Sequence, residues 1–161
     1  MHNTLLRGTY IVADIEAAIR FYRDALGWRL VYDNVLAVDR RFPPAAPDGA
    51  PCRLVVFQCE HEEIGGIGFM KYLEHEIAPG PSKHRGKLAE GEPILVVKSR
   101  DPDAVYQKVL ETEAVIVSPP ANWTVPGYEP GTVIRLRSLS LFDPNGLYVE
   151  VNLVLPPDTT P

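Results

Sequence analysis

The first half of the chain carries apolar side chains at helical spacing, flanked by short apolar runs. Residues 14–27 predict one amphipathic helix, which Asp14 can cap and Gly27 can end in a left-handed conformation. The apolar stripe of this helix consists of Ile15, Ala18, Ile19, Tyr22 and Leu26. The runs that predict strands are 5–12, 28–33, 53–59 and 64–72. Because it is rich in proline, the segment 41–51 is expected to be a loop.

The second half repeats this order. A strand-like run at 93–97 precedes a helix that begins with Asp101 as its cap and Pro102 at its first position. We expect its buried face to contain Val105, Val109 and Leu110. Three further strands are predicted at 114–117, 133–142 and 148–154. Each half therefore reads β-α-β-β-β, and the polar segment 77–91 is expected to link them.

Charge and composition exclude some partners. The 161 residues have a formal net charge of −5 and no lysine- or arginine-rich run, which argues against a nucleic-acid partner. No apolar stretch approaches the roughly 20 residues that span a bilayer, so no membrane partner is expected. The N-terminus lacks the pattern of a signal peptide, and we expect a cytoplasmic protein.

Two motifs resemble one superfamily. Asp14-Ile-Glu leads into a helix that carries Phe21-Tyr22, and Phe142-Asp-Pro-Asn-Gly leads into a strand that carries Glu150. Both resemble the vicinal-oxygen-chelate (VOC) superfamily of glyoxalases, bleomycin resistance proteins and extradiol dioxygenases. The resemblance implies an α+β fold, in which paired βαβββ modules form a curved, cup-shaped mixed sheet with helices on the outer face.

The same resemblance implies how the chain is divided. A single VOC domain would cover residues 1–161. Its parts would be a first module at about 4–76, the linker 77–91, a second module at about 92–154 and a disordered tail at 155–161. Pairing of the modules within one chain or across a dimer stays open, and a homodimer is expected because exposed sheet edges favour pairing.

In metal-dependent members of the superfamily, four side chains in the cup hold a divalent ion. Transferred by position, the four places are Arg7, Gly68, Ile94 and Glu150. Only Glu150 can bind a metal, because glycine has no side chain, isoleucine is apolar and a guanidinium stays protonated. The resemblance therefore predicts a degenerate metal site and no metal cofactor.

The expected interior of the cup is a small-molecule pocket with apolar walls and a few polar groups. Strand alternation and the resemblance place on it Arg7, Thr9, Gly68, Met70, Ile94, Tyr148 and Glu150. We predict an ion pair between Arg7 and Glu150, and the alternative for Arg7 is contact with solvent or a surface carboxylate.

Two other groups are candidates for ligand binding. Trp123 and Tyr128 lie in a predicted loop at 121–131, which is either a lid over the ligand or part of a dimer contact. Arg135 and Arg137 project from one face of their strand, either to grip an anion or simply to face solvent.

Three functions fit these observations. The first is a binding module that holds a small, aromatic molecule in a metal-free cup. The second is a metal-independent lyase or isomerase, with Glu150 as acid or base and Arg7 stabilising negative charge. The third is a metal-dependent glyoxalase-like lyase or dioxygenase, which requires that the ligand positions were assigned in the wrong register.

Overall fold

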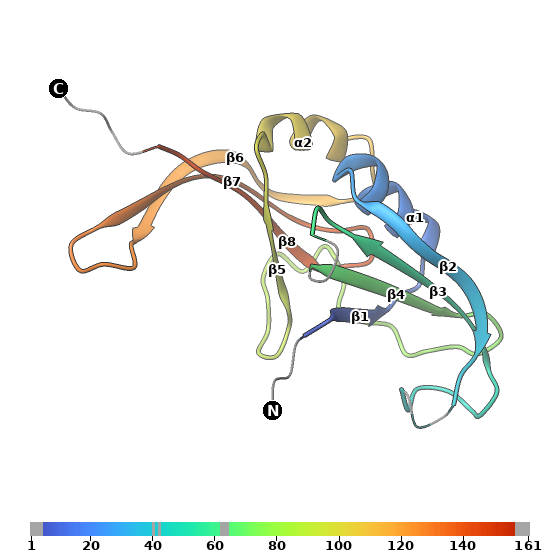
Figure 1. Cartoon of the computed structure of the whole chain (residues 1–161). Helices are drawn as coiled ribbons and strands as arrows, with labels where there is room; N and C mark the ends of the chain where they lie inside the picture. Colours follow the sequence, from blue (N-terminus) through green and yellow to red (C-terminus); the bar gives the residue numbers. More distant parts are fainter. Residues whose placement is uncertain (1–4, 40, 42, 62–64, 157–161) are drawn as a thin grey trace. The chain divides into compact units, whose positions relative to one another are not determined.

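Each half of the chain forms a four-stranded mixed sheet with a helix on one face, which confirms the predicted α+β fold (Figure 1). The computed structural model describes residues 5–39, 41, 43–61 and 65–156, and the chain divides into two compact units, Met1–Gly80 and Pro81–Pro161. The predicted division into a single domain with two modules stays a prediction. Of the predicted tail, residues 157–161 lie outside the described residues, as does Ile64 of the predicted strand 64–72.

The first unit has the sheet order β1-β4-β3-β2, with β1 parallel to β4 and the other pairs antiparallel. Its strands are β1 (Arg7–Ile11), β2 (Arg29–Ala37), β3 (Pro51–Gln58) and β4 (Gly66–Tyr72). Between β1 and β2 lie the helix α1 (Ile15–Ile19) and its π-helical continuation η1 (Arg20–Ala25).

Local signals set the ends of this helical segment as the sequence predicts. The Asp14 carboxylate accepts a hydrogen bond from the backbone N–H of Ala17 at 2.9 Å, and Gly27 takes the left-handed conformation with φ 75°. The buried side of the segment packs on one face of the sheet. Tyr22 is fully buried there, with its ring centroid 4.7 Å from that of Phe69 and 5.8 Å from that of Phe57. An aromatic cluster thus joins helix and sheet.

Arg53 on β3 holds the helix to the edge of the same sheet. Its guanidinium donates to the Asp33 carboxylate on β2 at 2.7 and 2.8 Å and to the Glu16 carboxylate on α1 at 2.5 Å. The pKa of Asp33 is lowered because Arg53 donates hydrogen bonds to its charged form. One cation therefore ties together α1, β2 and β3.

The second unit repeats the arrangement in the order β5-β8-β7-β6, with β5 parallel to β8. Its elements are β5 (Ile94–Lys98), α2 (Pro102–Val109), β6 (Val115–Pro126), β7 (Val133–Phe142) and β8 (Tyr148–Val154). Asp101 caps α2 by accepting from the N–H of Ala104 at 2.9 Å, as predicted. The predicted buried face of α2 is only partly right, because Val109 is 1% exposed but Leu110 is 54% exposed. Leu110 is the C-cap residue of α2, directly after the last helical residue.

The Asp-Pro-Asn-Gly turn between β7 and β8 is confirmed. The Asp143 carboxylate is completely buried and accepts from the backbone N–H groups of Asn145 at 2.9 Å and Leu147 at 2.8 Å. Gly146 has φ 92°, a conformation that glycine adopts without strain. The Asp143 side chain therefore stabilises the turn by hydrogen bonds to its backbone.

The strand β6 is much longer than the prediction of 114–117. It continues to Pro126, so the predicted loop at 121–131 is wrong over its first six positions, and the turn is shorter. The sequence Pro119-Pro120 argues against a strand here, because proline donates no backbone hydrogen bond, and the strand was therefore not predicted. The structure accommodates it by making β6 an edge strand, with register shifts between Ile116 and Ala121.

The segment that leads into β5 makes contacts inside the second unit. Lys83 donates to the backbone oxygen of Glu113 at 2.6 Å, and Arg85 donates to that of Gly146 at 3.1 Å. Arg85 also pairs with Glu92 at 2.8 Å and lies over the ring of Phe142, 4.2 Å from its centroid. Within the described residues, no helix is long and apolar enough to cross a membrane.

Candidate functional site

The sheet of the first unit has one face covered by α1 and one open face. In the parallel ladder, Thr9 on β1 lies opposite Gly68 on β4, and Ile11 lies opposite Met70. Their neighbours Tyr10 and Phe69 point to the helical side and pack with ring centroids 6.2 Å apart. The predicted ligand residues of the first unit therefore share the open face. They are Arg7, Thr9, Gly68 and Met70.

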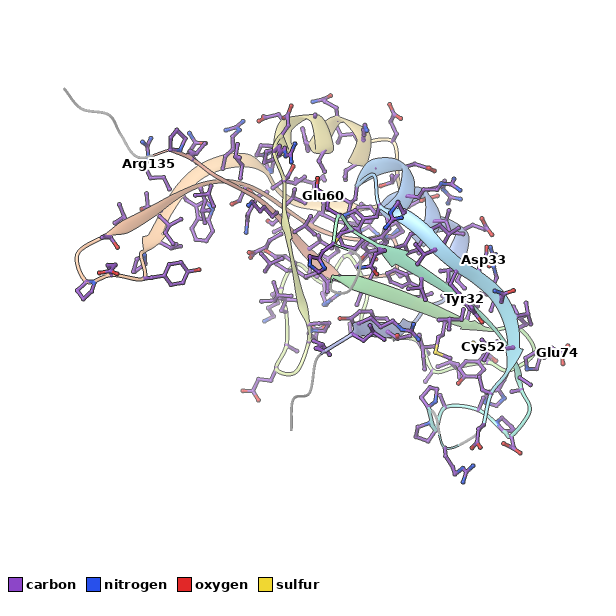
Figure 2. The ribbon with its side chains drawn as sticks, in the orientation of Figure 1. Tyr32, Asp33, Cys52, Glu60, Glu74 and Arg135 are labelled. Atoms are coloured by element: carbon purple, nitrogen blue, oxygen red, sulfur yellow. The ribbon has the colours of Figure 1, made fainter. Side chains whose placement is uncertain are left out.

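Two hollows of about 420 and 360 Å³ adjoin on this open face. Arg7 and Leu54 line both of them. The larger hollow is also lined by Leu6, Val31, Tyr32, Val56, Gln58 and Gly66. The smaller one is also lined by Thr9, Ile11, Leu36, Val38, Pro43 and Met70. Figure 2 labels Tyr32 on β2, whose chain neighbour Asp33 faces the helical side.

Arg7 is held over β4 by its neighbours. Its Nε donates to the Thr9 hydroxyl at 3.2 Å. A Cβ on Gly68 would lie 2.8 Å from that hydroxyl oxygen, and a Cβ on Gly66 would lie 3.3 Å from the Arg7 Cβ. The two glycines thus leave space for the side chains of Arg7 and Thr9, and a side chain at Gly68 would force the Thr9 hydroxyl to shift.

A small apolar cluster closes one end of the open face. It contains Val38, Ala50, Cys52, Met70 and Tyr72, with Ala45 and Ala46 of the connecting loop packed against it. Burial raises the pKa of the Cys52 thiol, and burial together with the nearby Cys52 raises that of Tyr72. The Cys52 side chain, labelled in Figure 2, is fully buried and is a packing residue rather than a nucleophile.

In the second unit, the face opposite α2 carries the other predicted residues. Ile94 lies opposite Tyr148 and Val96 lies opposite Glu150 in the parallel ladder of β5 and β8. Ile94 is 51% exposed, whereas Tyr148 and Glu150 are half-buried. Within its own unit, the described residues give the Glu150 carboxylate no hydrogen-bond or ion-pair partner.

The four positions transferred from the metal site correspond between the sheets. Gly68 lies two residues beyond the partner of Arg7, and Glu150 lies two residues beyond the partner of Ile94. The assignment of these four positions to the ligand places of metal-dependent relatives stays a prediction. In the described part of the chain, no group of three or more His, Cys, Asp or Glu side chains could hold a metal. The residues at the four positions do not fit a divalent ion, and at Gly68 the Thr9 side chain occupies the space a ligand would need.

The aromatic candidates are placed differently from each other. Trp123 lies within β6 opposite Leu136, on the same face as Ser138 and Glu150. Its indole N–H donates to the Ser138 hydroxyl at 2.6 Å, which holds the ring along the sheet. Tyr128 belongs to the turn between β6 and β7 and is 98% exposed. Trp123 is thus part of a sheet surface, and only Tyr128 lies on a turn.

The structure does not bring the two arginines of β7 to the face of Glu150. Strand alternation places Arg135 and Arg137 on the side of the sheet that carries α2. Arg137 donates to both oxygens of Asp103, in the first turn of α2, at 2.5 and 2.6 Å, and lowers the pKa of that carboxylate. Arg135, labelled in Figure 2, accepts a hydrogen bond from the N–H of Leu155 at its backbone oxygen, 2.9 Å away.

Sequence reasoning missed the part of the open face that β2 and β3 supply. Tyr32, Leu54 and Val56 line the hollows but were not among the predicted ligand residues. The strand β3 is apolar on both faces, so period-two alternation gives no sign of which side is open. The predicted pair of Arg7 with Glu150 joins residues of different units and stays a prediction.

The comparisons with known proteins agree with this arrangement of strands. The family model described as the Glyoxalase/Bleomycin resistance protein/Dioxygenase superfamily matches residues 4–151. None of the curated proteins compared with the chain matches it.

Solved structures match over nearly the whole chain. A glyoxalase family protein of Bacillus cereus is 17% identical, with a TM-score of 0.67, over 96% of this chain and 97% of its own. The trypanothione-dependent glyoxalase I of Leishmania major is 16% identical, with a TM-score of 0.57, over 93% and 86%. A protein from the mobile metagenome of V. pseudocholerae is 21% identical, with a TM-score of 0.52, over 94% and 95%. At these identities, the structures establish the fold.

Proposed function

The chain belongs to the Glyoxalase/Bleomycin resistance protein/Dioxygenase superfamily, and on that premise we propose that it binds a small aromatic molecule on the open face of its first sheet. The observation that carries the proposal is the pair of adjoining hollows that share Arg7 and Leu54. Their volumes lie within the range of about 300–1,000 Å³ that is usual for small-molecule sites.

The chemistry of the lining favours binding over metal-assisted catalysis. The floor is apolar, through Leu54, Val56 and Met70, and Tyr32 offers a planar side chain that is 40% exposed. Such a surface suits a flat ring, because aromatic groups bury large apolar areas and stack in offset or tilted geometry. The positions that correspond to the metal ligands of relatives supply one carboxylate, which supports a degenerate metal site in this chain.

The test is to block the hollows and measure binding of an uncharged aromatic probe. Phenylnaphthylamine, whose fluorescence rises in apolar sites, is titrated into the wild-type protein and into the variant Leu54→Trp. The added indole occupies space in both hollows, so we expect affinity to fall about tenfold, equivalent to about 1.4 kcal/mol. Val31→Trp narrows only the larger hollow at a position that is 51% exposed, which makes it a second blocking variant that leaves the core untouched.

Val96→Trp is the matched control. It places the same ring on the corresponding face of the second unit, at a residue that is 66% exposed. Binding that survives both blocking variants but is lost in Val96→Trp would move the site to the second sheet. Absence of probe binding to the wild-type protein would overturn the proposal.

A second candidate function follows from Glu150. Its half-buried carboxylate has no partner among the described residues of its own unit, and an unpaired carboxylate of this kind can act as an acid or base. A metal-independent lyase or isomerase would lose at least about 100-fold in kcat on Glu150→Gln, whereas a binding protein would keep its affinity. The expected homodimer and the cytoplasmic location stay predictions. Light scattering, which gives the molar mass in solution, would test the homodimer.

A further inference from the structure

The hollows on the first sheet are lined, among the described residues, by one cationic side chain and no anionic one. Among the described residues that line them, Arg7 has the only charged side chain, and the others are apolar or uncharged polar groups. The chain as a whole has a formal net charge of −5, so its overall field repels anions. A positive site on this face therefore depends on one guanidinium and its immediate surroundings.

The position of Arg7 leaves its outer nitrogen atoms available to a ligand. The Arg7 side chain makes its hydrogen bond through Nε, which donates to the Thr9 hydroxyl. In the described part of the chain, Nη1 and Nη2 have no hydrogen-bond or ion-pair partner. With Nε bonded to Thr9, the Nη1 and Nη2 groups can donate two parallel hydrogen bonds to the two oxygens of a carboxylate.

Arg7 also lies at the junction of the two hollows, since it lines both. A ligand that rests its ring on Leu54 and Val56 would bring a substituent on that ring to the guanidinium. Gly66 and Gly68 allow this close packing, because a Cβ at Gly68 would force the Thr9 hydroxyl to shift and a Cβ at Gly66 would crowd the Arg7 side chain. Apolar contact and ion pairing can thus act on one compact molecule.

From these observations we infer that the ligand is an aromatic carboxylic acid, whose ring lies on the apolar floor and whose carboxylate is bound by Arg7. The inference rests on the proposed function and specifies the class of ligand. It makes Arg7 the residue that sets specificity, because the apolar floor does not distinguish an acid from its uncharged amide.

The experiment uses two pairs of probes that differ only in charge. Anilinonaphthalene sulfonate carries the rings of phenylnaphthylamine together with an anionic group, and both report binding by fluorescence. In the second pair, naphthoate and naphthamide compete with the bound sulfonate probe. Each is measured on the wild-type protein, on Arg7→Gln and on Lys71→Gln. Lys71 is the control because it lies on the same strand as Gly68 but points to the opposite face of the sheet.

We expect Arg7→Gln to lower affinity for the sulfonate probe and for naphthoate about tenfold, while affinity for the two uncharged probes stays within about twofold. Lys71→Gln, which removes the same charge, should change none of the four. Arg7→Lys should restore only part of the anion preference, because an ammonium lacks the fork of two donors.

The outcomes separate the two proposals. If the uncharged probe binds and Leu54→Trp removes it, the proposed site stands. If Arg7→Gln then weakens charged and uncharged probes equally, or weakens neither, the inference about the carboxylate is overturned. If the sulfonate probe weakens equally in Arg7→Gln and Lys71→Gln, the anion preference is a general charge effect, and the inference fails as well.

Discussion

The two units share one order of elements, but their helices are attached in different ways. In the first unit, α1 buries Ile15, Ala17, Ala18 and Ile19, and η1 adds Phe21 and Tyr22. In the second, α2 buries only Pro102 and Val109. The first helix is thus embedded in an aromatic cluster, whereas the second rests on the aliphatic face made by Leu139, Leu141, Val149 and Val151. A repeated topology therefore does not require a repeated core.

The largest effect on this comparison should come from the aromatic cluster. Phe69→Ala removes a fully buried ring that contacts Tyr10, Tyr22 and Phe57. We expect a loss of about 3–5 kcal/mol in the free energy of unfolding, since the cavity cannot collapse fully. Urea denaturation followed by circular dichroism measures it. A loss below about 1 kcal/mol would contradict the view that this cluster holds the helix.

The corresponding change in the second unit should cost less. Val109→Ala removes two methyl groups from the residue that anchors α2, which corresponds to about 1.5–2 kcal/mol at about 0.8 kcal/mol per methyl-sized group. Leu110→Ala, at a position that is 54% exposed, is the matched control and should change stability by less than about 0.5 kcal/mol. Equal losses in both variants would mean that α2 packs along a different face.

The smallest of the three effects concerns the arginine that ties α1 to the sheet edge. Arg53→Met should lower stability by about 1 kcal/mol at neutral pH, because its partners are partly exposed and solvent screens the interaction. Arg53 lowers the pKa of Asp33 in the folded state. Stability from this interaction is therefore present above the unfolded pKa of Asp33, about 3.9, and is lost as pH falls through its folded pKa.

The pH dependence gives the check on that prediction. The difference in unfolding free energy between wild type and Arg53→Met should shrink as the pH is lowered from about 6 to about 3. A difference that is constant over this range would mean that Arg53 stabilises through the packing of its aliphatic stem instead of through its charge.

Features set by neighbours in the chain were predictable from the sequence. The caps at Asp14 and Asp101 and the turn around Asp143 each depend on a side chain that bonds to backbone only a few residues away. Features set by pairing with a distant strand could not be predicted from the sequence. The length of β6 depends on its position at the sheet edge and on the register shifts around Pro119 and Pro120, where its pairing with β7 is interrupted.

The residues of the candidate site were likewise only partly predictable from the sequence. Arg7 and Thr9 could be placed on the open face, because alternation along β1 is clear and the family resemblance supplied the direction. Leu54 and Val56 could not, because β3 is apolar on both sides and only its register with β4 decides which residues share the face of Gly68. The sequence therefore predicts the part of the site that β1 contributes but not the part that β3 contributes.

The prolines of β6 have a consequence for how the chain behaves in concentrated solution. An edge strand of twelve residues would ordinarily offer a long template for intermolecular β-pairing. Successive N–H groups of a strand point to opposite sides, so the pair Pro119-Pro120 removes one donor from the free edge, and the register shifts there interrupt the regular ladder. An incoming strand could add to either end of β6 but could not run along its whole length. The same residues that prevented the prediction of this strand thus limit intermolecular pairing along the β6 edge.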